Sequence, residues 1–196
     1  MNRQTRYVVV MGVCGSGKTE TARRLAAATD NAWLDADDHH PKANVEHMSR
    51  GLPLNDEMRW PWLDAVSTAA EHVGQSTDPT TPRGNPFPGT VFIACSALKR
   101  RYRDYLRTRL GEVSFVFLNG PRDLIFERMN SRAGHFMPSQ LLDSQLHDLE
   151  PPGPDEDPLA VSIEGPLEDI VQTAVSGLKQ RYAASDARLA PGTDVK

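Results

Sequence analysis

The chain has 196 residues, a length that suits one domain with its own hydrophobic core. Its 22 basic and 26 acidic residues give a formal net charge of −4, which argues against a nucleic-acid-binding surface. No apolar run approaches the roughly 20 residues that span a bilayer, and two cysteines provide no disulfide framework. We therefore expect a globular cytoplasmic protein without nucleic-acid or membrane partners.

Short apolar runs alternate with amphipathic stretches, which predicts an α/β protein with a largely parallel sheet. Strands are expected at residues 7–11, 32–34, 90–94, 114–118 and 159–163. Helices are expected at residues 18–28, 41–50, 62–73, 99–110, 122–131 and 167–182. The proline-rich segment 76–89 predicts a surface loop. The pattern favours a single domain over residues 1–183, followed by a frayed tail at 184–196.

The first predicted strand leads into a glycine-rich stretch, Gly12-Val13-Cys14-Gly15-Ser16-Gly17-Lys18-Thr19. This stretch satisfies the phosphate-loop pattern G-x-x-x-x-G-K-[ST], whose glycines let backbone N–H groups approach a phosphate closely. The helix that follows points its positive N-terminal end at the phosphates. Lys18 is expected to reach the β- and γ-phosphates, and the Thr19 hydroxyl to ligate Mg²⁺. The stretch predicts a nucleoside triphosphate site, and the chain length suits a small-molecule or nucleotide kinase.

Two carboxylates, Asp35 and Asp37, stand at the end of the second predicted strand. Residues i and i+2 of a strand project to the same side, and the carboxyl ends of parallel strands form the ligand crevice of an α/β sheet. One acid can hold Mg²⁺ while the other accepts the proton of an attacking hydroxyl. The alternative is a solvated turn. The histidines that follow match no zinc-binding spacing.

Cationic side chains recur further along the chain. Arg59 lies beside two tryptophans, so it forms either a surface cation–π pair or a fork for the carboxylate of an acidic substrate. Lys99 and Arg103 are four residues apart on one predicted helix, where cations form either a solvated face or part of an acceptor pocket. Positions 91–98 contain no acid, which shifts the expected metal ligands toward Thr19 and Asp35.

Arg128 and Arg132 are also four residues apart, just before Gly134. Two guanidinium groups followed by a glycine hinge indicate a lid, at about residues 128–150, that closes over the transferring phosphoryl group. A surface salt bridge with Glu127 is the alternative.

Taken together, these blocks resemble the gluconate kinases (gluconokinases) of the P-loop type. The segments that carry the resemblance are MGVCGSGKT at 11–19, LDADDHHPKANVEHM at 34–48, GLPLNDEMRWPWL at 51–63, ACSALKRRYRDYLR at 94–107 and ERMNSRAGHFMPSQLLDSQLHDLEPP at 127–152. The phosphate loop is shared by many kinases, whereas the later segments together are specific to this family.

The resemblance implies ATP-dependent phosphorylation of D-gluconate at its 6-hydroxyl. It implies a three-layer, adenylate-kinase-like fold, with a five-stranded parallel sheet flanked by helices and a small helical lid, and a homodimer. It implies that Asp35 is the metal partner and that Asp37 deprotonates the acceptor. The residues that it places around the sugar acid are Asp37, His40, Arg59, Lys99, Arg103 and His135, with Arg128 and Arg132 on the lid.

Two other functions stay open at the sequence level. A shikimate or nucleoside-monophosphate kinase would share the phosphate loop and the lid. A non-catalytic ATP-binding switch would share the loop alone, but it would need no acceptor pocket, so the paired acids and lid arginines argue against it.

Overall fold

The computed structural model describes residues 5–76, 87–131 and 139–189, with the side chains of 139–141 and 185–189 left aside. Its centre is one sheet of five strands, all parallel, in the order β2-β3-β1-β4-β5. The strands are β1 (Arg6–Met11), β2 (Ala32–Asp35), β3 (Thr90–Ala94), β4 (Val113–Asn119) and β5 (Leu159–Ser162). The predicted five-stranded parallel sheet is confirmed, with each strand close to its expected position.

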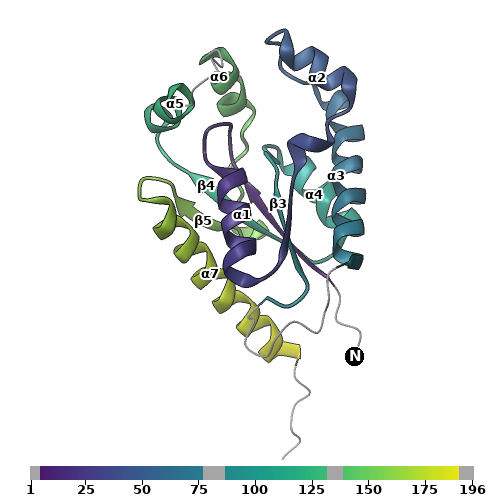
Figure 1. The fold of residues 1–196 in the computed structure, drawn as a ribbon, viewed down its shortest axis with the longest axis vertical. Helices are drawn as coiled ribbons and strands as arrows, with labels where there is room; N and C mark the ends of the chain where they lie inside the picture. The colour runs from purple at the N-terminus through teal and green to yellow at the C-terminus, as the bar shows by residue number, and fades with distance from the viewer. Residues whose placement is uncertain (1–4, 77–86, 132–138, 190–196) are drawn as a thin grey trace, which may run out of the picture.

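Helices surround the sheet (Figure 1). They are α1 (Lys18–Thr29), α2 (Lys42–Ser49), α3 (Asp56–Ser76), α4 (Arg100–Leu110), α5 (Arg122–Asn130), α6 (Ser139–Asp148) and α7 (Leu167–Leu189). Two short 3₁₀ helices, η1 (Ala36–His39) and η2 (Pro154–Glu156), lie between them. None of the described helices is long and apolar enough to cross a bilayer.

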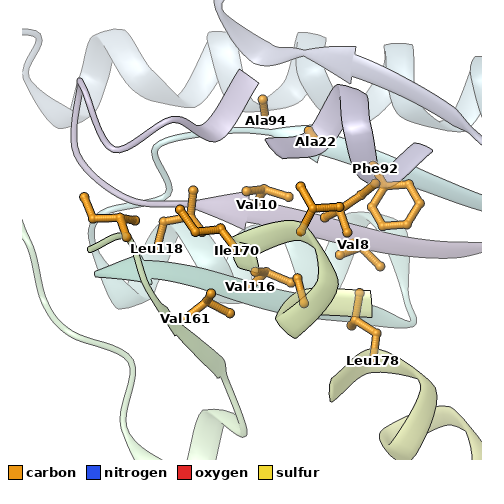
Figure 2. Packing of buried hydrophobic residues seen from close by; sticks show 14 of the residues in the cluster. Val8, Val10, Ala22, Phe92, Ala94, Val116, Leu118, Val161, Ile170 and Leu178 are labelled. Carbon is orange, nitrogen blue, oxygen red and sulfur yellow. The ribbon is translucent and has the colours of Figure 1, made fainter. Parts of the chain in front are cut away.

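The strands are apolar on both faces because helices cover both faces, as expected for a parallel sheet. Successive side chains alternate between the faces. Val8 and Val10 pack with α1 and α7 in one core cluster, part of which Figure 2 shows. Val9 and Met11 join a second cluster with α3 and α4 on the opposite face. This three-layer arrangement fixes the carboxyl ends of the strands, where the phosphate loop begins.

Two helices extend beyond their predicted bounds. Helix α3 begins at Asp56, ahead of the predicted start at 62, because the Asn55 side chain accepts a hydrogen bond from the Met58 N–H (2.9 Å) and caps it. Its acidic first turn also suits the positive end of the helix dipole. Helix α7 runs to Leu189, past its predicted end at 182, so the expected tail is helical in its first residues.

Candidate active site

The phosphate loop joins the central strand β1 to helix α1. Gly15 and Gly17 have φ angles of 77° and 94°, in the left-handed region that favours glycine. A Cβ at Gly12 would lie 2.8 Å from the Leu118 carbonyl oxygen, so a side chain there would collide with the neighbouring strand. These glycines therefore let the loop fold tightly against β4 and keep its backbone free of side chains.

Polar groups line the loop and suit a phosphate ligand. The Lys18 Nζ donates to the Val13 carbonyl oxygen at 3.0 Å, so the ammonium group folds back over the loop. The Ser16 Oγ is buried and has no hydrogen-bond partner among the described residues. The first turn of α1 adds N–H groups and the positive end of the helix dipole. This part of the structure fits the triphosphate site that the sequence predicts.

Asp35 links the loop to strand β2. Its Oδ2 accepts a hydrogen bond from the Thr19 hydroxyl at 2.7 Å, and its Oδ1 accepts one from the Asp37 N–H at 3.0 Å, which caps η1. Hydroxyl and carboxylate oxygens are the hard donors that Mg²⁺ prefers. Thr19 and Asp35 are thus brought together as predicted, although no group of three metal-ligating side chains occurs among the described residues.

Asp37 lies beside the loop lysine, with its side chain 75% exposed. Partial desolvation by the surrounding protein raises the pKa of Asp37, the positive charge of Lys18 opposes that shift, and Asp35 and Asp38 add to it. Asp37 is therefore more basic than an isolated aspartate. Bound substrates would remove water from around Asp37 and increase this effect.

His40 is held rigidly next to Asp37. Its ring stacks on Trp62 with centroids 4.4 Å apart, and its Nε2 is 3.7 Å from Asp37 Oδ1. Trp62 in turn donates from its indole N–H to the Ala36 carbonyl oxygen at 2.7 Å, which anchors η1 to α3. Burial, together with the nearby Arg59, lowers the pKa of His40 to about 4. The imidazole is thus neutral at physiological pH and can donate or accept a hydrogen bond.

Arg59, on α3, is only 8% exposed, and its Nε has no hydrogen-bond partner in the described part of the chain. Its guanidinium lies over the Tyr102 ring, 5.6 Å from the centroid. Its charge lowers the pKa of His40. A buried donor without a partner carries a desolvation cost, which an anionic ligand would offset. Arg59 thus forms its cation–π contact in the protein interior, not at the surface as the sequence-based alternative had it.

Lys99 stands between two helices. Its Nζ lies 3.0 Å from Asp56 Oδ1, at the start of α3, and 3.7 Å from Asp148 Oδ1, at the end of α6. The Tyr102 hydroxyl also donates to Asp56, so this aspartate is shared, and these partners lower its pKa. Lys99 therefore lies where α3 and α6 approach each other, with an acidic residue on each side.

Arg103 does not line an open pocket, contrary to the sequence-based expectation. Its side chain is 1% exposed and forms a two-point salt bridge with Glu156, at 2.6 and 2.7 Å. Its remaining guanidinium nitrogen donates to the carbonyl oxygens of Ala97 and Leu98. With these bonds made and no exposed surface, Arg103 has no free face for a substrate. Spacing alone could not reveal this, because Glu156 lies far away in the sequence.

The lid arginines are only partly described. Arg128, on α5, donates to the Ile163 carbonyl oxygen at 2.6 Å, just beyond β5. Arg132 and His135 lie outside the described residues. The sequence reasoning missed Gln145 on α6, whose side-chain oxygen accepts the Cys14 N–H of the phosphate loop at 2.7 Å. Gln145 lies within the segment 127–152 that carries the resemblance, but no catalytic or phosphate-binding pattern singles it out.

The buried Cys95 follows β3, and burial raises the pKa of its thiol to about 12.

The phosphate loop on a central parallel strand, with acids at the end of β2, defines a small P-loop kinase. A shikimate kinase from Aquifex aeolicus has the same fold, with a TM-score of 0.52 at 15% identity. A solved gluconokinase from Sinorhizobium meliloti is more similar, with a TM-score of 0.79 and 39% identity, covering 97% of this chain and 100% of the other.

Curated relatives identify the family. The thermoresistant gluconokinase of Escherichia coli is 41% identical over 91% of this chain and 97% of its own length. The gluconokinase of Gluconobacter oxydans is 41% identical over 84% of this chain and 86% of its own. No family model matches the sequence. The chain belongs to the gluconokinase family.

Proposed function

We propose that the protein transfers the γ-phosphoryl group of ATP to the 6-hydroxyl of D-gluconate, giving 6-phospho-D-gluconate and ADP. The observation that carries the acceptor assignment is that Asp37, beside Lys18, and the buried, incompletely bonded cation Arg59 both lie near His40. A sugar acid offers a hydroxyl at one end and a carboxylate at the other. Asp37 suits the hydroxyl, and Arg59 suits the anion.

The transfer needs a base, a charge acceptor and positioning groups. The bond between the sugar O6 and the γ-phosphorus forms while the bond from that phosphorus to the bridging oxygen of ADP breaks, and the hydroxyl proton passes to Asp37. Lys18 neutralises negative charge on the phosphates. His40, neutral and fixed on Trp62, is placed to hydrogen-bond a substrate hydroxyl. Lys99 contributes a further cation on the acceptor side.

Thr19 and Asp35 would hold Mg²⁺, because both present oxygen donors that are already in contact. When bound, the ion supplies neutralisation of the phosphate charge. Arg128 and Arg132 are proposed to stabilise the transferring group, with His135 on the acceptor. The protein is further proposed to be a homodimer located in the cytoplasm. Light scattering of the purified protein tests the dimer.

An acceptor screen tests the activity. Purified protein with ATP and Mg²⁺ is given gluconate, shikimate and nucleoside monophosphates in separate reactions, and ADP release is coupled to NADH oxidation. Gluconate alone should stimulate release, and phosphorus NMR should place the product phosphate on O6. If shikimate or a nucleotide stimulates ADP release instead, the protein is another small kinase of this fold. If ADP release needs no acceptor at all, the result contradicts the proposed kinase activity.

A Lys18→Ala variant belongs in the same screen. Without the ammonium group the phosphates lose their charge partner, so gluconate-dependent turnover should fall to background. Activity that persists in this variant would come from a contaminating kinase or from a site other than the phosphate loop.

A further inference from the structure

The turn between β3 and α4 contains a residue in an unusual conformation. Ala97 has a φ of 41° and is completely buried. A residue with a Cβ adopts the left-handed region only where its surroundings hold it there, and such positions cluster at functional sites. Contacts around Ala97 must therefore hold it in this conformation.

Arg103 supplies the restraint from the first turns of α4. One terminal nitrogen of its guanidinium donates to the Ala97 carbonyl oxygen at 3.1 Å and to the Leu98 carbonyl oxygen at 2.9 Å. The Nε and the other terminal nitrogen bind the two oxygens of Glu156. Both side chains are nearly inaccessible, at 1% and 3% exposure. Hydrogen bonding from Arg103, the largest contribution, holds the pKa of Glu156 at about 2, so the pair is charged at neutral pH.

The restrained turn reaches the site from two directions. The Ser96 carbonyl oxygen accepts the N–H of Gly12, the first residue of the phosphate loop, at 3.4 Å. At its other end the turn leads directly to Lys99, whose Nζ lies between α3 and α6. The Leu98 carbonyl oxygen also accepts the Glu150 N–H at 3.0 Å, which ties the turn to the segment after α6. A shift of this turn would move both the loop and the acceptor-side cation.

We propose that Arg103, fixed by Glu156, is a positioning residue that sets the Ala97 turn and through it the place of Lys99 on the acceptor side. This inference rests on the proposed function, in which Lys99 serves the acceptor. Arg103 touches no substrate. It acts because one planar guanidinium can bind a carboxylate along one side and two backbone carbonyls along another, which an ammonium group cannot do.

The test compares two arginines that share Glu156. Arg103→Lys keeps the charge and one bond to Glu156 but loses the simultaneous contact with the turn. Arg107→Lys is the matched control, because Arg107 binds Glu156 Oε2 at 3.4 Å and its carbonyl oxygen at 3.1 Å but has no bond to the turn. KM for gluconate, KM for ATP and hydrogen–deuterium exchange of peptides covering residues 96–100 and 149–151 are measured for both. Glu156→Gln serves as a second variant if Arg103→Lys does not fold.

In Arg103→Lys, KM for gluconate should rise roughly tenfold or more and KM for ATP should rise clearly less, because Lys99 follows the turn directly whereas the phosphate loop is tied to it by one long hydrogen bond, of 3.4 Å. Exchange of the two peptides should accelerate in this variant and not in Arg107→Lys. Equal effects in both variants, or an unchanged KM with unchanged exchange, would overturn the proposal. If the wild-type protein does not phosphorylate gluconate, the proposed function fails, and the exchange comparison alone then decides whether Arg103 holds the turn.

Discussion

Asp37 carries the proton transfer in the proposed reaction. Asp37→Asn removes the base but keeps the shape of the side chain, so kcat should fall by at least about 10² while ATP binding changes little. Steady-state kinetics and calorimetric titration of the nucleotide measure the two effects. The exposed neighbour Asp38, changed to Asn, is the control and should stay near wild-type activity. Near-normal turnover of Asp37→Asn would remove this residue from the role of base.

His40 makes the stability of the protein depend on pH. Its pKa is about 4 in the folded protein against 6.5 as the ordinary value, so the unfolded chain binds the proton first as the pH falls. The contribution of neutral His40 to the free energy of unfolding is therefore fully present above about pH 6.5. It is lost as the pH falls from there to about 4, which lowers the free energy of unfolding by on the order of 3 kcal/mol. In His40→Gln, urea unfolding should show a smaller difference between pH 7 and pH 5. An equal difference in both proteins would mean that His40 does not contribute.

For single residues, the sequence predicts the local motif better than it predicts which residues the side chain contacts in the folded chain. Lys18 and Thr19 belong to a local pattern that predicts their roles, and the structure places the Thr19 hydroxyl against Asp35, as the sequence predicts. Lys99 and Arg103 look equivalent in the sequence, yet one lies between two helices and the other is sealed against Glu156. Their difference depends on contacts distant along the chain, which neither periodicity nor spacing encodes.

At the scale of elements, helix α6 touches the phosphate loop. Gln145 accepts the Cys14 N–H, a donor that a triphosphate is expected to use. Gln145→Ala removes this competition, so the dissociation constant for ATP should fall by up to about tenfold, the worth of one hydrogen bond. Calorimetry measures it, with the exposed Gln172→Ala as control. Unchanged or weaker ATP binding would indicate that the glutamine does not compete with the nucleotide.

Element boundaries followed from local signals where these were strong. The strands were found close to their predicted places because their residues are continuously apolar. The start of α3 was missed because Pro61 lies inside its early turns, although Asn55 caps the helix. Helix α6 lacks such signals, so the sequence predicts this segment only as part of the lid.

At the scale of the whole molecule, two clusters on opposite faces of the sheet hold the layers together. Leu178 on α7 is fully buried in the first of them (Figure 2). Leu178→Ala should lower the free energy of unfolding by about 2–5 kcal/mol, because it removes buried methyl groups and leaves a cavity. Denaturant unfolding measures this, and Leu52→Ala, at 45% exposure, should change stability by less than about 0.5 kcal/mol. Similar losses in the two variants would contradict this account of the core.

The strand order places β1 in the middle, with β3 and β2 on one side and β4 and β5 on the other. Asp37, Arg59 and Lys99 come from the β2–β3 half, whereas Arg128 meets Ile163 at the end of β5. The residues proposed for the acceptor thus share one half of the sheet, on the far side of the central strand from Arg128. Replacement of the segments that carry Asp37, Arg59 and Lys99, with Asp35 kept, is therefore the route to another acceptor alcohol that leaves the phosphate loop unaltered.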